Sequence, residues 1–368
     1  YFTKLFCRNS SREVISMSVT SKECALPTLR QTVQHNCHIA DAIYAGDYTL
    51  CIYLLKMREF YRWERGLPYN SALENKSVGE WLREREMLWD SLENNQFESV
   101  IIDNQEFDPF DTTAINAALK EYDLVYSGGL GLKAKPHFFL GQLHHRQDVD
   151  DYTVYVSNNE YARDLTAPPA MALGQTIFIR RESLKRMLWE KLEEWRWNRP
   201  ANAMARAIKH YDFKSDVDAA LDNMTEAELN SALLHEIGEV EAGKWLGEEW
   251  EQMLAELPRS KAEIMLRALR DHLADALSTL PALLEQEQEA SLHFYFANLN
   301  SMRKHMYPSL LSAYKQWYEN GKLKPLQRQV QQGRDHWQSL AENTLELYRQ
   351  RGPEAREAIE SLLEDSLL

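Results

Sequence analysis

The chain has 368 residues, of which 44% are hydrophobic and 27% are charged, a composition typical of a folded globular protein rather than a disordered one. Its 56 acidic and 42 basic residues give a net charge of −14, which repels phosphate backbones and predicts no nucleic-acid binding. No apolar run approaches the roughly 20 residues that a membrane helix needs, so we expect no membrane insertion.

Residues 1–16 have neither helical periodicity nor the apolar centre of a secretory signal. We interpret them as a leader or a processed remnant, with Met17 as the true start. All four cysteines lie within the first 51 residues, at Cys7, Cys24, Cys37 and Cys51. A secreted disulfide scaffold would distribute its cysteines along the chain, so we expect reduced thiols and a cytoplasmic location.

Residues 17–96 are predicted to form an N-terminal helical region. Apolar side chains recur at helical spacing from Leu29 to Tyr44, and Gly46 follows as a helix-ending residue. A second helix is expected after Asp47, and a third begins at the capping-box sequence Ser77–Glu80. Three helices are therefore expected between residues 28 and 95.

Residues 97–181 change in character and are predicted to form a small α+β region with an antiparallel sheet. A helix is expected from Asp111, ending before a glycine-rich segment, Gly128–Lys133, that is interpreted as a turn. The segments rich in β-branched and aromatic residues are strand candidates. They are Val100–Ile102, Pro136–Leu140, Tyr152–Val156 and Gln175–Ile179.

Residues 182–368 return to helical periodicity and predict a long C-terminal helical bundle, interrupted at several prolines and at Gly321. The fold class that follows is α+β and mostly helical. It consists of a helical N-terminal region, a small antiparallel β-sheet and a long C-terminal helical bundle.

The best candidate site lies in this bundle, where one imidazole and three carboxylates occur within residues 235–241. Residues four apart share one helix face, so His235 and Glu239 can converge on one ion or proton. The run 235–238 resembles the start of the zincin metalloprotease motif, His-Glu-x-x-His, in which the histidines bind zinc and the glutamate is the general base. The resemblance implies His235 as a ligand and Glu236 as the base. Glu239 replaces the second histidine, which removes most of the support for a protease and leaves Glu239 as a substitute ligand.

A second cluster follows about 30 residues later, at Asp271–Asp275. If the helices around 225–256 and 260–278 form an antiparallel hairpin that turns near Pro258, equal steps from the turn bring Glu239 opposite Asp275, with His272 about one turn away. Histidines and carboxylates on facing helices are the general ligand set of helical di-iron and di-manganese sites. We therefore predict a divalent metal ion, zinc, iron or manganese, held by His235, Glu239, His272 and Asp275, with Glu236 as the catalytic proton acceptor.

Two alternatives remain open for these residues. The charged side chains also fit solvated helix faces, and Gly238, Gly243 and Gly247 fit either a closely packed partner helix or a helix break. A separate face with His35, His38 and Asp41 could contribute to a Cys/His zinc site, but it fits a helical core equally well. His38, Asp41 and Glu59 could also join the C-terminal cluster.

The function predicted from the sequence is a cytoplasmic metalloprotein, with a metal-dependent enzyme as its sharper form. The His/carboxylate site would lie between helices. The alternative is a non-catalytic binding or assembly protein whose acidic helices face a protein partner or a second copy of the chain.

Overall fold

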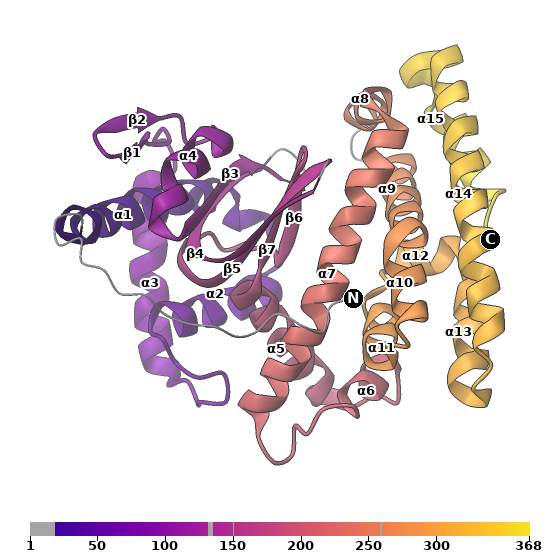
Figure 1. Cartoon of the computed structure of the whole chain (residues 1–368), viewed down its shortest axis with the longest axis horizontal. Helices are drawn as coiled ribbons and strands as arrows, with labels where there is room; N and C mark the ends of the chain where they lie inside the picture. Colours follow the sequence, from indigo (N-terminus) through magenta and orange to yellow (C-terminus); the bar gives the residue numbers. More distant parts are fainter. Residues whose placement is uncertain (1–18, 132–134, 150, 258–259) are drawn as a thin grey trace, which may run out of the picture. The chain divides into compact units, whose positions relative to one another are not determined.

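The computed structural model describes residues 19–131, 135–149, 151–257 and 260–368, and the side chains of its first helix from Leu26 onward. The leader predicted at 1–16, the start at Met17 and the turn at Pro258 lie outside the described residues. The fold is mostly helical α+β, as predicted, with N-terminal helices, a small sheet and a helical C-terminal region (Figure 1).

The chain divides into two compact units that interleave along the sequence. Unit 1 holds the described residues up to Tyr48 together with Arg85–Gly141 and Tyr161–Leu165. Unit 2 holds Thr49–Glu84, Gln142–Glu160 and Thr166–Leu368. The division into 17–96, 97–181 and 182–368 stays a prediction.

The three predicted N-terminal helices are confirmed. They are α1 (Val19–Tyr44), α2 (Leu50–Glu64) and α3 (Asn75–Leu92), with a 3₁₀ turn, η1 (Ala45–Asp47), after α1. The stripe of apolar residues on α1 is buried in the core of unit 1, where Leu29, Val33 and Cys37 pack with residues of the hairpin and the sheet. Helix α3 begins at Asn75, two residues before the predicted start.

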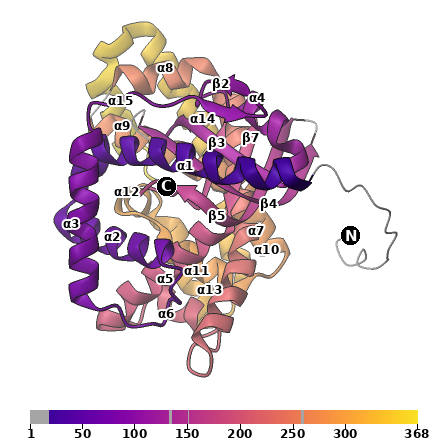
Figure 2. The same cartoon turned by 90° about the vertical axis from the view of Figure 1, so that its left-hand side faces the viewer.

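The segment after α3 forms a hairpin and a short helix in unit 1 (Figure 2). Its elements are β1 (Val100–Ile102), β2 (Gln105–Phe107), α4 (Thr112–Ala118) and a 3₁₀ turn, η2 (Leu119–Tyr122). Strand β1 and the helix after Asp111 were predicted, and the Asp111 side chain caps α4 by accepting from the Ala114 backbone N–H at 3.0 Å. Strand β2 was not predicted.

The turn predicted at Gly128–Lys133 is wrong in its first half. Gly128 lies inside β3 (Leu124–Leu130), while residues 132–134 are outside the described residues. A Cβ atom on Gly128 would lie 2.0 Å from the Pro109 carbonyl oxygen and 2.6 Å from the Tyr126 hydroxyl. The glycine is therefore explained by close backbone approach within the sheet region rather than by a turn.

The remaining strands are β4 (Pro136–Val149), β5 (Tyr152–Arg163), β6 (Ala170–Leu173) and β7 (Thr176–Arg180). With β3 they form a sheet of order β3-β4-β5-β7-β6. Strands β6 and β7 pair antiparallel around Gly174, whose φ of +59° suits glycine. The five-stranded sheet is mixed rather than wholly antiparallel, because β5 pairs with β7 in parallel, with Val154 opposite Ile177.

Helices make up the chain from residue 181 onward, as predicted. They are α5 (Arg181–Asn198), α6 (Ala203–Ile208), α7 (Val217–Leu246), α8 (Glu248–Glu256), α9 (Lys261–Ala274), α10 (Leu280–Glu285), α11 (Glu289–Asn298), α12 (Ser301–Met306), α13 (Pro308–Asn320), α14 (Leu323–Arg351) and α15 (Arg356–Glu364), with a π-helical turn, η4 (Asp275–Thr279), and a 3₁₀ turn, η5 (Gly352–Ala355). In the part of the chain that the structure describes, no helix is both long and apolar enough to cross a membrane.

Helix α7 occupies a central place in unit 2, with β6 and β7 on one side and α9 and α10 on the other (Figure 1). Ile237 and Val240 of α7 belong to the same apolar cluster as Ile177 and Ile179 of β7. The helix that the sequence predicted to run on to 256 is broken at Gly247, which has a φ of +74° between α7 and α8.

Candidate functional site

The backbones of α7 and of the C-terminal end of α9 meet at Gly238. A Cβ atom there would lie 2.3 Å from the carbonyl oxygen of Ala274, the last residue of α9. The close partner helix that the glycines suggested is therefore present at this position, whereas Gly247 marks a helix break and Gly243 faces open space. Because the helices touch here, His235, one turn before Gly238, lies beside Asp275.

Asp275 is the centre of a buried hydrogen-bond network and is only 1% exposed. Its carboxylate accepts from His235 Nδ1 at 2.8 Å and from Thr279 Oγ1 at 2.9 Å. It also accepts from Arg303 Nη2, which comes from α12 and donates in addition to the Tyr295 hydroxyl at 3.0 Å. Asp275 begins the π-helical turn η4, an irregularity that proteins often place at functional sites.

The pair of His235 and Asp275 is held in its charged form. Burial disfavours the imidazolium, but Asp275, and then Glu239 and Glu236, outweigh this effect and raise the pKa of His235 to about 10. Burial also disfavours the carboxylate, yet the charges of Arg303 and His235 hold the pKa of Asp275 well below its usual range. The bond to Asp275 fixes Nδ1 as a donor and leaves Nε2 as the other ring position.

Two more carboxylates stand next to this pair. Glu239 pairs with Arg270 Nη2 at 2.7 Å, and its side chain is 16% exposed. Asp271 lies close enough to feel Arg303, Glu239, His235 and Asp275 electrostatically. Burial, and to a smaller extent Glu239 and Asp275, raise the pKa of Asp271 to about 6. This cluster therefore contains more carboxylate groups than cationic groups.

Glu236, the predicted proton acceptor, is buried on the side of α7 that faces β6. Its carboxylate accepts from the backbone N–H of Ala172. Burial, followed by the repulsion from Glu239, raises the pKa of Glu236 to about 7, although His235 and Arg270 act in the opposite direction. A carboxyl group with such a pKa can both accept and release a proton near neutral pH.

The contacts of His272 involve none of the other predicted ligands. Its Nε2 bonds to the carbonyl oxygen of Arg303 at 3.0 Å, and its ring stacks on Trp337 with centroids 5.0 Å apart. Burial, and then the charge of Arg303, lower the pKa of His272 to about 3, so the ring is neutral. His272 is therefore a core residue between α9 and α14.

The structure thus brings three of the four predicted ligands into one neighbourhood. His235 contacts Asp275, and Glu239 acts on His235 electrostatically, whereas the His272 ring is engaged elsewhere. Among the described residues, no group of three or more His, Cys, Asp and Glu side chains is already placed to hold a metal ion. Metal ligation by His235, Glu239, His272 and Asp275 stays a prediction, as does catalysis by Glu236.

Sequence reasoning missed the two arginines of this site. Arg303 lies 28 residues beyond Asp275 and belongs to no recognisable motif, so only the fold reveals the pair. Arg270 directly precedes the cluster Asp271–Asp275 in the sequence, and a basic residue next to its two carboxylates was a usable signal. Both arginines pair with carboxylates that the sequence predicted as metal ligands, Glu239 and Asp275.

Family comparisons match two successive parts of the chain. Residues 28–180 match the N-terminal domain, and residues 185–366 the C-terminal domain, of a family of unknown function (DUF6866). Together the two matches cover most of the chain. The chain belongs to this family. The site around His235 lies within the C-terminal domain match. Neither a search of curated proteins nor a search of solved structures found a match.

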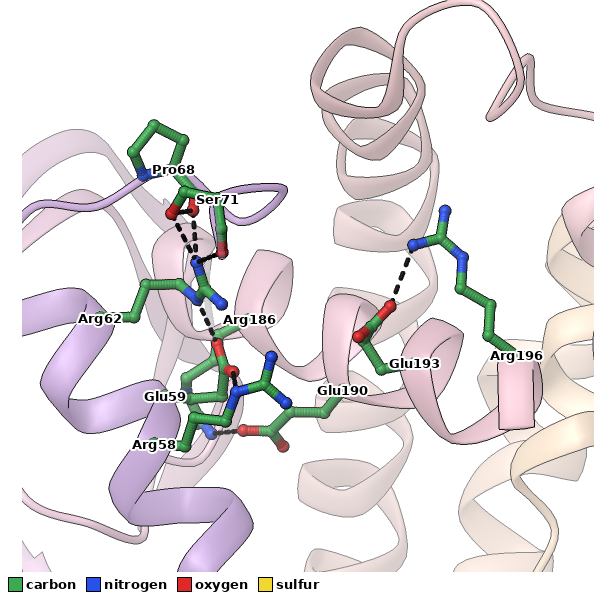
Figure 3. Close-up of polar contacts among 9 residues, drawn as sticks. All are labelled: Arg58, Glu59, Arg62, Pro68, Ser71, Arg186, Glu190, Glu193 and Arg196. Atoms are coloured by element: carbon green, nitrogen blue, oxygen red, sulfur yellow. Dashed lines mark hydrogen bonds and ion pairs between the residues drawn. The ribbon is translucent and has the colours of Figure 1, made fainter. Parts of the chain in front are cut away.

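A second buried charge cluster joins α2, from the N-terminal domain match, to α5, from the C-terminal one (Figure 3). Arg62 Nε donates to Glu59 at 3.0 Å, and its Nη1 donates to the Ser71 hydroxyl at 3.0 Å and to the Pro68 carbonyl. Arg186 donates to Glu190 at 2.7 Å. Each carboxylate has its own guanidinium here, and Arg62 fixes the loop after α2.

The N-terminal histidines of the family's first domain are held by separate partners within unit 1. His35 pairs with Glu98 at 3.4 Å, and the His38 ring contacts Arg85 and Trp89. Asp41 accepts from the Leu165 N–H at 2.8 Å. Burial, and then Arg85, lower the pKa of His38 to about 3. These contacts favour the core interpretation of this helix face.

Proposed function

We propose that the family's C-terminal domain binds a divalent metal ion through His235 Nε2, Glu239 and Asp271. The observation that carries the proposal is the hydrogen bond from His235 Nδ1 to Asp275. Metal-binding histidines commonly donate their second ring N–H to a carboxylate, which fixes the tautomer and the direction of the ring. In this arrangement Asp275 orients His235 and is not itself a ligand.

The donor set suits zinc, iron or manganese, because one imidazole nitrogen is combined with carboxylate oxygens. The charge of the cluster also suits a metal cation, because the cluster contains more carboxylate groups than cationic groups. Binding requires His235 to release its Nε2 proton to solvent, which its raised pKa disfavours, and Glu239 to exchange Arg270 for the metal. Arg270→Gln is therefore expected to strengthen metal binding.

When bound, the metal would act as a Lewis acid or redox centre. Glu236 would accept or release protons on the side of α7 that faces β6. This is the enzymatic form of the proposal.

The cytoplasm is the expected compartment, because reduced thiols are typical of it. The Cys37 side chain is a buried thiol that donates to the Phe138 carbonyl at 3.3 Å.

The test is metal binding by the full chain after it has been stripped with a chelator. Zinc, manganese and iron(II) are titrated separately by calorimetry, and bound metal is measured by elemental analysis. We expect stoichiometric binding of at least one metal that is abolished by His235→Ala. Asp275→Asn should weaken it about 10–100-fold, the usual effect of removing an orienting carboxylate.

Two histidines serve as matched controls. His272→Gln removes the predicted ligand that lies in the core, and His305→Ala removes the surface histidine that pairs with Glu364 at 2.9 Å. Neither change should alter the metal content of the folded protein. If the stripped wild type takes up none of the three metals, or if His305→Ala lowers uptake as much as His235→Ala, the proposal fails.

The second candidate is an assembly protein, and the start of α2 favours it. Leu50 is 70% exposed, and Ile52 and Leu54 are each 46% exposed. Leu50 and Leu54 lie one turn apart on the same face of α2, and exposed apolar side chains grouped in this way often mark a protein contact. Under this candidate the wild type sediments as an oligomer and a triple substitution of these residues by serine as a monomer. A monomeric wild type would count against it.

A further inference from the structure

A cleft of about 460 Å³ lies in unit 1, far along the chain from the His235 cluster. It is lined by Phe97, Ser99, Glu106, Phe107, Asp108, Pro109 and Phe110. Its volume falls within the range of about 300–1,000 Å³ that is typical of ligand pockets. The lining combines three phenylalanine rings, called the aromatic floor below, with two carboxylates, called the acidic edge.

The aromatic floor is anchored to the core. Phe97 and Phe110 meet edge to face with centroids 5.6 Å apart, and each also contacts the fully buried Phe138, at 5.0 and 5.3 Å. The Asp108 side chain accepts from the Phe110 backbone N–H at 2.8 Å, which fixes the turn that carries Phe110. Phe110 is nevertheless 39% exposed. The cleft therefore presents a fixed aromatic surface to solvent.

One wall of the cleft is the β1–β2 hairpin. Asp103 and Asn104 have φ values of 50° and 63°, as a tight two-residue hairpin turn requires. Ile101 pairs with Glu106 across the hairpin, so both side chains lie on one face, and Ile101 is 58% exposed. The exposed face of the hairpin therefore continues the combination of apolar and acidic groups found in the cleft.

The charge of the cleft is uncompensated. Glu106 is exposed and makes no ion pair with any of the described residues, and the charged groups that line the cleft are the two carboxylates. A cation is attracted both to carboxylates and to the faces of aromatic rings. The geometry therefore favours a ligand with a positive group next to an apolar one.

We propose that this cleft binds a segment of a partner protein in which lysine or arginine alternates with large apolar side chains. The hairpin is a two-stranded sheet, and within the described part of the chain β2 pairs with β1 alone. An extended segment can add to such an edge and place alternate side chains into neighbouring pockets. Apolar side chains would contact Phe97, Phe107 and Phe110, and the basic ones Glu106 and Asp108.

The experiment uses the full chain and three fluorescent peptides of equal length. One alternates leucine with lysine, the second alternates leucine with glutamate, and the third alternates serine with lysine. Binding is measured by fluorescence anisotropy. The leucine–lysine peptide is expected to bind saturably, and the other two at least about tenfold more weakly.

Variants locate the binding. Phe110→Ala removes part of the floor, and Glu106→Lys reverses the charge of the edge without disturbing the core. Each should weaken the leucine–lysine peptide about tenfold. Glu106→Lys should also strengthen binding of the leucine–glutamate peptide, which a merely unfolded variant would not do. Glu354→Lys is the matched control, because it makes the same charge change at an exposed position of unit 2.

Three results would overturn the proposal. The first is no saturable binding of the leucine–lysine peptide up to about 1 mM. The second is equal loss of binding in Glu106→Lys and Glu354→Lys, which would show attraction to the acidic surface as a whole. The third is self-association of the wild type that Phe110→Ala abolishes, since a second copy would then occupy the cleft. Metal binding at His235 is not required for any of these outcomes.

Discussion

Gly238→Ala tests how α7 meets the C-terminal end of α9, because the cluster around His235 depends on that contact. The added methyl carbon would lie 2.3 Å from the Ala274 carbonyl oxygen and 2.8 Å from its carbonyl carbon. Carbon and carbonyl oxygen approach no closer than about 3.3 Å in ordinary contacts. The clash is with backbone, so no side-chain rotation relieves it, and the two helices must separate by about 1 Å.

Two opposing effects set the size of the change. Alanine stabilises a helix interior by about 1 kcal/mol relative to glycine. Overpacking a closed contact typically costs about 1–3 kcal/mol, and more where backbone must move. Because backbone must move in Gly238→Ala, we take the clash as about 2–4 kcal/mol, which leaves a net loss in the free energy of unfolding of about 1–3 kcal/mol after the helical gain.

Gly243→Ala is the matched control on the same helix. A Cβ atom at Gly243 has no neighbour within 4 Å, so only the helical gain of about 1 kcal/mol applies. Urea denaturation of both variants measures the difference, which should be at least about 2 kcal/mol in favour of Gly243→Ala. Equal stability of the two variants would refute the close approach of α7 to the Ala274 carbonyl.

Three further predictions concern buried charges of unit 2. Arg62→Met should lower the free energy of unfolding by about 3–5 kcal/mol, because it leaves Glu59 buried without its closest partner. Arg58 is exposed and lies 3.9 Å from Glu59, so Arg58→Met should cost less than about 1 kcal/mol. Asp275→Asn should likewise cost about 3–5 kcal/mol at pH 7, measured by urea denaturation; a loss below 1 kcal/mol would contradict a buried ion pair. Burial raises the pKa of Glu228 to about 7, so the folded state retains a proton that the unfolded state releases, and stability falls between about pH 4.5 and 7. Glu228→Gln should therefore raise stability at pH 8 by at most about 3 kcal/mol and have little effect at pH 4; equal effects at both pH values would contradict the raised pKa.

Elements with a strong local signal could be predicted from the sequence. The apolar stripe from Leu29 to Cys37 gave α1, and the Asp111 cap gave α4, because both signals arise within a few residues. Strands β2, β3 and β6 were missed. Asp103 and Asn104 form the tight turn that glycine usually marks, and Gly128 serves close packing inside a strand. The turn at Asp103 and Asn104 and the packing of Gly128 depend on which residues are neighbours in the folded structure, and a single sequence does not show this.

The site could be predicted only in part, for a geometric reason. The two helices that carry His235 and Asp275 face each other as expected. Their contacts are displaced by about one helical turn, because Asp275 contacts His235 instead of Glu239. The prediction assumed a straight helix up to residue 256, and the break at Gly247 shifts the register. The position of Arg303 could not be predicted by counting residues from a helix turn, because α10 and α11 lie between Asp275 and α12.

The two buried clusters of unit 2 contain the same kinds of side chain and differ in the balance of their charges. Between α2 and α5, Glu59 and Glu190 each pair with an arginine of their own. At α7 and α9, four carboxylates share two guanidinium groups and one imidazole; they are Glu236, Glu239, Asp271 and Asp275. A buried carboxylate without its own cation must bind a proton or a cation from solution. A metal ion would therefore relieve an excess of acid at α7 and α9, whereas at α2 and α5 it would meet arginines that already neutralise the carboxylates.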